Sequence, residues 1–401
     1  MSGSYPHYQQ LILILLDKIY NKNRAAAEET KGKVMKIYCN RTELNKALNN
    51  VSHSVPVRTT SNILEGILIN ADSDRMILTS TDTNMTTETV IKAQAEGTCE
   101  FVVPAKLFSA IISKLPEEDM MIDYDNGKSK INIKSGGSSS EIICFSGDEY
   151  PKIRLDEGEN VIYLDKEDVK KLIKKTAFSA STDEFNRIIT GVLLEIKDGS
   201  MKMVGVDPYR IATYKIDIDN SSNISVIIPA KLIIEVSKFI DDEGDPKMSF
   251  EIIDNKVVLK FNNNKVIINT YSGKFIDYER IIRKEGNINI RVKKDDLLRS
   301  TERASLLASV QNNNLIRFNI GKDMIYITSL NEEGNIEEKV EIINDGEDLN
   351  IGINSRYMKD ALSVIEDEEI MINFKDSVSP AIIKPLKGDK YTYLILPIRM
   401  N

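Results

Sequence analysis

Hydrophobic and polar residues alternate along most of the chain, as they do in half-buried strands, and six segments interrupt this alternation with helical spacing. The strand pattern is clear at residues 131–134 and 256–260. Helices are expected at residues 40–50, 104–115, 165–180, 230–240, 293–308 and 355–365. Short helices among many strands joined by polar turns predict an α+β fold with antiparallel sheets.

The same pattern occurs three times at a nearly constant spacing. Ile37–Leu44 is matched by Ile162–Val169, 125 residues further on, and then by Ile290–Leu297, another 128 residues on. Val103–Leu107 and Ile228–Leu232 are again 125 residues apart, and each contains a Pro where a helix is expected to begin. A spacing of this kind indicates an internal repeat. We therefore predict three domains of one fold, at residues 35–156, 157–285 and 286–401, each with two helices and antiparallel sheets.

Charge is distributed unevenly between the predicted helices and the rest of the chain. The chain of 401 residues has a net charge of −8, yet the six helices together hold 17 Lys and Arg against 9 acidic residues. They therefore sum to +8 and the remainder to −16. If all six helices lined one face, that face would bind phosphates without reading base sequence. The alternative is that these are ordinary solvated lysines on helix surfaces.

No enzyme, cofactor or metal is predicted. The two histidines, His7 and His53, lie near no nucleophile motif. Residues 126–129 (Asn-Gly-Lys-Ser) superficially resemble a phosphate loop, but they join two strands, and a type I′ hairpin turn is expected there. The acidic residues 117–119 are expected in a solvated turn, and the three widely spaced cysteines in the core. No apolar run approaches the roughly 18 residues that span a bilayer, so we expect a cytoplasmic protein with no membrane partner.

Four motifs point to a known family. The first repeat contains residues 57–60 (Val-Arg-Thr-Thr). The second contains residues 206–212 (Val-Asp-Pro-Tyr-Arg-Ile-Ala) and 275–278 (Phe-Ile-Asp-Tyr), and the third contains residues 393–399 (Tyr-Leu-Ile-Leu-Pro-Ile-Arg). Together they resemble the beta subunit of bacterial DNA polymerase III, the sliding clamp. The resemblance extends from Met35 to the C-terminus.

This resemblance implies a non-catalytic processivity factor. Such a subunit would dimerise head to tail into a ring of six domains around double-stranded DNA, with helices inside and sheets outside. The interface would join Leu306 and Leu307 to the first-domain edge strand near residues 138–144. The basic helices, and for Arg58 the family's loop, predict these phosphate contacts: Arg58, Lys174, Lys175, Arg187, Arg299 and Arg303.

The family also has a cleft between the middle and last domains, where the polymerase alpha subunit, the clamp loader and repair proteins bind through short peptide motifs. Carried over residue by residue, its wall comprises Ile189, Val206, Pro208, Ile211, Ile276, Arg280, Ile281, Asn354, Tyr357, Leu396, Pro397, Ile398 and Arg399. This chain has Pro208 where a small residue is common, and Ile276 where Pro is usual. These departures predict a cleft with its own peptide preference.

Residues 1–34 precede the repeat and share nothing with it. An upstream start codon or an appended extension is one interpretation. The other is that residues 10–15 (Gln-Leu-Ile-Leu-Ile-Leu), which resemble the peptides bound by clamps, occupy the cleft of the same or a neighbouring ring. A different class of function, a repeat-built scaffold that uses its acidic surface and encloses no DNA, also stays open at this point.

Overall fold

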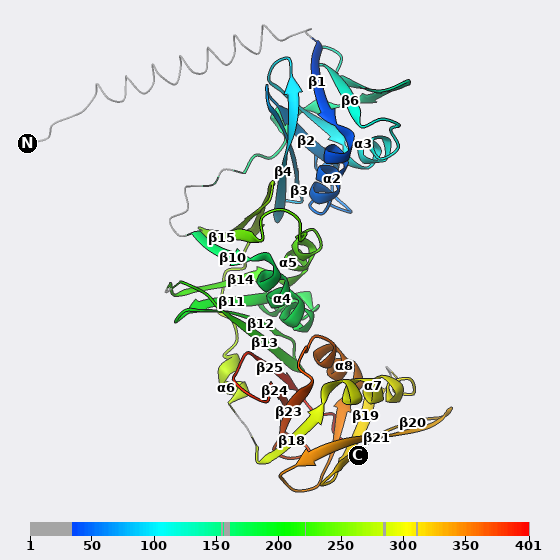
Figure 1. The fold of residues 1–401 in the computed structure, drawn as a ribbon, viewed down its shortest axis with the longest axis vertical. Helices are drawn as coiled ribbons and strands as arrows, with labels where there is room; N and C mark the ends of the chain where they lie inside the picture. The colour runs from blue at the N-terminus through cyan, green and yellow to red at the C-terminus, as the bar shows by residue number, and fades with distance from the viewer. Residues whose placement is uncertain are drawn as a thin grey trace, which may run out of the picture. The chain divides into compact units, whose positions relative to one another are not determined.

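The computed structural model describes residues 34–153, 155, 161–220, 222–283, 286–309 and 312–400. Residues 10–15, for which a cleft-binding role was considered, lie outside these ranges. The chain divides into two compact units. The first reaches residue 154 and includes residues 263–266, and the second holds the rest, with the middle and last repeats together (Figure 1).

In the part of the first unit that the structure describes, two α-helices lie among short strands. Its elements are β1 (Val34–Asn40), α2 (Arg41–Ser52), η1 (Asn62–Glu65), β2 (Gly66–Ala71), β3 (Arg75–Thr81), β4 (Met85–Ala95), β5 (Cys99–Pro104), α3 (Ala105–Ile112), β6 (Asp119–Asp125), β7 (Lys130–Ser135), β8 (Ser138–Ile143), β9 (Phe145–Ser146) and η2 (Gly147–Glu149). β1 lies between β4 and β6 in the sheet. Beyond β6, the sheet continues with β7 and then β8.

Local sequence explains the first helix. The Asn40 side chain accepts hydrogen bonds from the Thr42 and Glu43 backbone N–H groups at 2.9 and 3.1 Å, which satisfies two of the free donors at the start of α2. The buried stripe Leu44, Ala47, Leu48 and Val51 then packs α2 onto the core. Cys39, Cys99 and Cys144 are buried and free, which confirms that the cysteines are core residues.

The middle repeat has the same plan with one extra helix at its end. Its elements are β10 (Val161–Asp165), α4 (Lys166–Thr176), η3 (Ala177–Ser179), η4 (Glu184–Thr190), β11 (Gly191–Lys197), β12 (Ser200–Val206), β13 (Arg210–Asp217), β14 (Ile224–Pro229), α5 (Ala230–Ser237), β15 (Lys247–Ile253), β16 (Lys256–Phe261), β17 (Asn264–Asn269) and α6 (Tyr278–Ile282). Gly205 lets β12 pass close to the end of α4, since a Cβ there would lie 2.2 Å from the Thr176 carbonyl oxygen.

The last repeat completes the second unit. Its elements are β18 (Ile288–Lys293), α7 (Lys294–Ala304), β19 (Leu315–Ile320), β20 (Met324–Asn331), β21 (Gly334–Asn344), β22 (Leu349–Asn354), α8 (Ser355–Ser363), β23 (Glu369–Phe374), β24 (Ala381–Pro385) and β25 (Tyr391–Ile395). A single sheet joins the two repeats in the order β14-β11-β12-β13-β25-β24-β23-β18-β21-β20-β19-β22. At the junction β13 and β25 are antiparallel, with Ile211 opposite Leu394 and Tyr214 opposite Tyr391.

The three repeats end in the same way. In the first, β9 pairs with β5; in the second, the Tyr271 N–H donates to the Ile227 carbonyl of β14; in the third, the Ile398 N–H donates to the Gly352 carbonyl of β22. Each segment that follows the last long strand therefore closes the edge of the strand that leads into the second helix. This shared detail supports three copies of one fold.

The six predicted helices are confirmed as α2, α3, α4, α5, α7 and α8, while the short helix α6 was not predicted. Pro104 and Pro229 are N-cap residues, one position earlier than expected. The prediction of a type I′ turn at residues 126–129 was wrong. Residues 126–129 form a four-residue loop in which the Lys128 N–H donates to the Asp125 carbonyl and only Ser129 has a positive φ, of 51°. A type I′ turn needs positive φ at two successive central residues.

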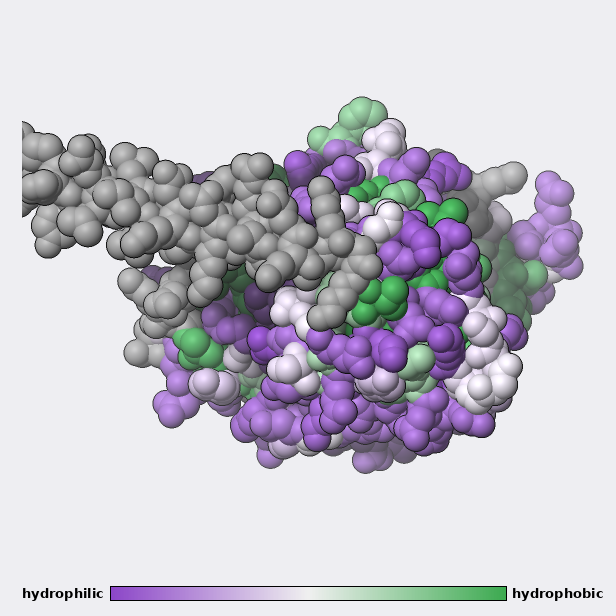
Figure 2. All heavy atoms as spheres, turned by 90° about the horizontal axis from the view of Figure 1, so that it is seen from above, coloured by the Kyte–Doolittle hydropathy of each residue, from purple (hydrophilic) through white to green (hydrophobic). Residues whose placement is uncertain are grey.

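The surface seen along the long axis is mostly hydrophilic, with hydrophobic residues in small separate patches (Figure 2). Among the described residues, no helix is long and apolar enough to cross a membrane.

Candidate functional site

The two faces of the sheet differ where β13 meets β25. On one face Val206, Ile211 and Leu394 belong to a single buried apolar cluster, hereafter the junction cluster, which Phe275 and Tyr278 help to cover. On the other face Arg210 donates to the Phe178 carbonyl of η3. Side chains alternate between the faces of a strand, so the junction cluster and η3 lie on opposite sides of the sheet.

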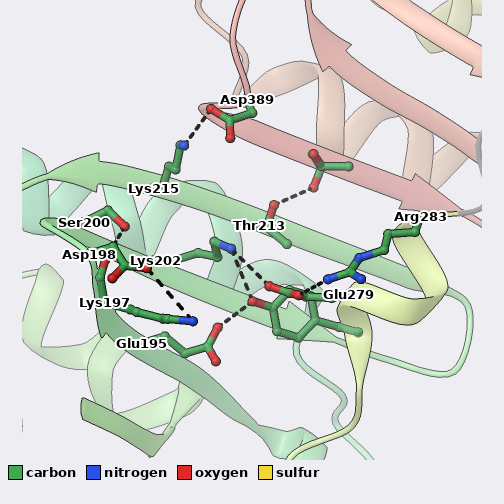
Figure 3. Close-up of polar contacts among 12 residues, drawn as sticks. Glu195, Lys197, Asp198, Ser200, Lys202, Thr213, Lys215, Glu279, Arg283 and Asp389 are labelled. Carbon is green, nitrogen blue, oxygen red and sulfur yellow. Dashed lines mark hydrogen bonds and ion pairs between the residues drawn. The ribbon is translucent and has the colours of Figure 1, made fainter. Parts of the chain in front are cut away.

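The short helix α6 is fastened over the junction cluster by the buried Tyr278. Figure 3 shows Glu195 and Lys202 pointing from the sheet towards the side of α6 that carries Glu279. The Tyr278 hydroxyl donates to Glu195 Oε2 at 2.5 Å, and Lys202 Nζ lies 3.5 Å from the same hydroxyl and 3.7 Å from Glu279 Oε1. Burial, and next the hydrogen bond to Glu195, raise the pKa of Tyr278 well above its ordinary value, so it remains a donor. The Asp277 side chain caps α6 by accepting from the Arg280 N–H at 3.2 Å. These contacts fix the segment that carries Ile276, Arg280 and Ile281.

The turn between β12 and β13 presents an aromatic side chain at the end of the junction. Asp207 Oδ1 accepts hydrogen bonds from the backbone N–H groups of Tyr209 and Arg210 at 2.8 and 2.9 Å, which holds the turn closed. The exposed Tyr209 ring stacks against Tyr357 of α8 with centroids 6.2 Å apart, and the Tyr209 carbonyl accepts from the Leu396 N–H at 2.8 Å. The turn, α8 and the C-terminal segment therefore meet here.

Sequence reasoning missed Tyr209, although it lies between two predicted cleft residues in the same motif. Its aromatic, half-polar character beside Pro208 was the available signal. A tyrosine that exposes most of its ring next to a second tyrosine suits contact with a short apolar peptide.

The predicted cleft residues fall into two groups. Four are buried: Ile189, Val206, Ile211 and Asn354. Nine are at least partly exposed: Pro208, Ile276, Arg280, Ile281, Tyr357, Leu396, Pro397, Ile398 and Arg399. Val206, Ile211 and Ile276 join the junction cluster, and Tyr357 and Leu396 meet at Tyr209.

The Asn354 side chain is occupied by hydrogen bonds within the protein. Its Oδ1 caps α8 by accepting from the Arg356 and Tyr357 N–H groups, and its Nδ2 donates to the Asn313 carbonyl at 2.7 Å. A cavity of about 740 Å³ lies beside the junction cluster, between β14 and residues 270–279, but of the predicted cleft residues it touches only Ile276. We place the candidate site on the Tyr209, Tyr357 and Leu396 side, because exposed and half-buried apolar groups from three segments converge there.

The predicted phosphate contacts differ in how free their charges are. Lys174 and Arg299 are exposed on α4 and α7, and Arg58 is exposed on the loop after α2. The exposed Arg187 lies over the Tyr271 ring at 4.5 Å, at the rim of a cavity of about 660 Å³ in the middle repeat. Arg303 donates from Nε to Glu338 Oε1 at 2.8 Å, so carboxylate competes with phosphate there.

Lys175 is held inside the protein. Its side chain is 4% exposed, its Nζ lies 3.1 Å from Glu366 Oε2 and 4.9 Å from the centre of the Tyr214 ring. Burial alone would raise the pKa of Glu366, but the hydrogen bond and charge of Lys175 hold that pKa below its ordinary value. The role of Lys175 as a phosphate contact stays a prediction, and the burial of its side chain and its pairing with Glu366 weigh against it.

The predicted interface residues lie at the end of α7. Leu306 is largely exposed and Leu307 half-buried, and the Leu307 carbonyl accepts from Asn331 Nδ2 at 3.2 Å. In the first unit, β8 ends its sheet and exposes Ile143. Within the described ranges no group of three or more His, Cys, Asp or Glu is placed to hold a metal ion.

Three sequence profiles of the DNA polymerase III beta subunit match the chain: that of the N-terminal domain at residues 35–154, of the central domain at 163–277 and of the C-terminal domain at 279–399. The beta sliding clamp of Staphylococcus epidermidis is 32% identical over 363 residues, covering 88% of this chain and 96% of the relative. The crystal structure of the DNA polymerase sliding clamp from Bacillus subtilis has a TM-score of 0.89 at 29% identity and covers 92% of this chain and 100% of that one. For the DNA polymerase III beta subunit from Thermotoga maritima the TM-score is 0.84 at 27% identity, with the same coverage. The chain therefore belongs to the family of DNA polymerase III beta subunits, the beta sliding clamps.

Proposed function

We propose that two copies of this chain close head to tail into a ring around duplex DNA, and that the ring tethers the replicative polymerase and other replication and repair proteins in the cytoplasm. As a member of this family the chain is a non-catalytic processivity factor. The observation that carries the proposal is the β13–β25 pairing, because it already joins two repeats edge to edge inside one chain.

The repeat extends this pairing to a second copy. β21 is the counterpart of β13, and β8 the counterpart of β25. Within the described residues β8 pairs only with β7, and residues 334–341 of β21 pair only with β20. Both strands thus have a free edge of the kind that pairs with another chain. Leu306 lies near the β21 edge, since it follows three residues after Arg303 of α7, which binds Glu338 of β21.

DNA would be held without sequence preference by mobile basic side chains. The exposed Arg58, Lys174, Arg187 and Arg299 support this role directly, while Lys175 and Arg303 would first have to leave Glu366 and Glu338. The acidic remainder of the chain would repel DNA from the exterior.

Partner proteins would bind through short apolar peptides in the predicted cleft. The exposed Tyr209 and the half-buried Tyr357, with Leu396 and Ile281, supply apolar surface beside the junction cluster. The residue composition of the cleft and the domain boundaries 35–156, 157–285 and 286–401 stay predictions.

The deciding experiment is retention on DNA of different topology. After loading, the ring should stay on nicked circular DNA and leave when the DNA is linearised. Leu306→Asp should lower the mass in light scattering from a dimer to a monomer and abolish retention, whereas Val378→Asp, at another exposed apolar position of the last repeat, should do neither. Equal retention on both DNAs would favour the scaffold function instead.

A further inference from the structure

Arg210 lies on the helix side of the sheet and is almost fully enclosed, with 8% of its surface exposed. Its guanidinium uses all three nitrogens. Nε donates to Asp207 Oδ2 at 2.9 Å, Nη1 to Asp360 Oδ2 at 2.6 Å and Nη2 to the Phe178 carbonyl at 2.8 Å. One side chain therefore links the β12–β13 turn, helix α8 and the end of η3.

The same guanidinium also lies against two aromatic rings. Its Cζ is 4.5 Å from the centre of the Tyr357 ring and 5.3 Å from that of Phe178. Tyr357 in turn stacks on Tyr209, the residue that precedes Arg210 in the chain. Arg210 thus contacts one tyrosine of the pair by its side chain and is bonded to the other through the backbone.

We propose that Arg210 is a positioning residue for peptide binding: it holds the Tyr209 and Tyr357 rings together as one wall of the cleft without touching the peptide. This inference rests on the proposed function of the cleft. The three polar contacts and the burial of Arg210 direct its side chain away from the junction-cluster face.

Electrostatics explains why this arrangement is rigid. A buried cation is stable only when it is paired and hydrogen bonded, and here two carboxylates and a carbonyl satisfy it. Asp207 belongs to the same turn as Arg210, so Asp360 is the partner that ties the turn to the last repeat. Loss of the guanidinium would leave Asp207 and Asp360 facing one another with no cation between them. The turn and α8 would then move apart, and with them the two rings.

The chain contains a matched control. The buried Lys175 also forms an ion pair between the middle and last repeats, 3.1 Å from the exposed Glu366 carboxylate, but neither residue contacts Tyr209 or Tyr357 in the described contacts. Removing this pair weakens the docking of the two repeats in general and leaves the tyrosine wall in place.

The test compares Arg210→Met, Arg210→Lys and Lys175→Met in the full-length dimer. Binding of a fluorescein-labelled Gln-Leu-Ser-Leu-Ser-Leu peptide is measured by fluorescence anisotropy, alongside the thermal midpoint. Arg210→Met should weaken binding by about tenfold or more, because it removes one partner of a buried charge pair. Arg210→Lys should restore part of the affinity, since the charge beside Asp360 returns. Lys175→Met should lower the thermal midpoint and leave peptide affinity within about twofold.

Tryptophan fluorescence reports directly on the order of the wall formed by residues 209 and 357. The protein contains no Trp, so Tyr209→Trp introduces a single indole at the rim of the site. Adding Arg210→Met should lower the anisotropy of that indole, and adding Lys175→Met should leave it unchanged. Unaltered peptide affinity in Arg210→Met, or an equal loss in Lys175→Met, overturns the proposal. If the unmodified protein binds no peptide, the proposed cleft function fails, and the indole measurement still decides whether Arg210 holds the wall.

Discussion

Truncating two exposed apolar residues should weaken partner binding by a predictable amount. Leu396 is 36% exposed and Ile281 37%, so roughly a third of each side chain is free for a peptide to cover. Burying a whole side chain of this size contributes about 1.5–3 kcal/mol, so covering a third gives roughly 0.5–1 kcal/mol for each. Leu396→Ala combined with Ile281→Ala should therefore cost about 1–2 kcal/mol, which corresponds to a roughly fivefold to thirtyfold weaker Kd.

The assay is a titration of the labelled peptide against full-length protein, followed by anisotropy. Val378→Ala is the matched control, because Val378 is 66% exposed on the last repeat and lies outside the predicted cleft. The backbone bond from Leu396 to Tyr209 survives truncation, so the dimer and its thermal midpoint should change little. An unchanged Kd in the double variant, or the same loss in Val378→Ala, would mean that the peptide binds elsewhere.

Three further outcomes are expected. Tyr278→Phe should lower the free energy of unfolding by about 1–2 kcal/mol in urea denaturation, because it removes a hydrogen bond to the Glu195 carboxylate; an unchanged value would show that α6 is held by apolar packing alone. Stability should fall as pH rises from about 9 towards 11, since burial raises the pKa of the Cys144 thiol from 9.0 to about 11 and the unfolded chain releases that proton first; Cys144→Ala should reduce the fall, and an identical pH profile would contradict the reasoning. Lys174→Ala with Arg299→Ala should make the slope of log K against log salt shallower by about 2 for DNA binding, and a constant slope would remove both residues from the phosphate contacts.

The sequence was sufficient to predict the repeated architecture. Helical periodicity and repeat spacing identified the six helices α2, α3, α4, α5, α7 and α8, and α8 begins at Ser355, where the predicted helix at residues 355–365 was expected to start. These features depend on local pattern and on the repeat, which a single sequence displays.

Features that depend on side-chain partners could not be predicted. A count of lysines on α4 does not distinguish Lys174, which is exposed, from Lys175, which is buried against Glu366. The aromatic wall at Tyr209 requires Tyr357, nearly 150 residues away, to stack on it. The loop at residues 126–129 has the composition of a tight turn, but the register of β6 and β7 leaves four residues to close it.

The continuous sheet through β13 and β25 has a consequence for the dynamics of the second unit. The backbone amides of both strands take part in interior ladders, so neither strand can open without breaking the hydrogen bonds of the other. Amide hydrogen exchange at Ile211, Thr213 and Leu394 should therefore be governed by one opening event. The middle and last repeats, though separate in sequence, should behave as a single cooperative unit, and a local fluctuation on one side of the seam should be reported by protection on the other.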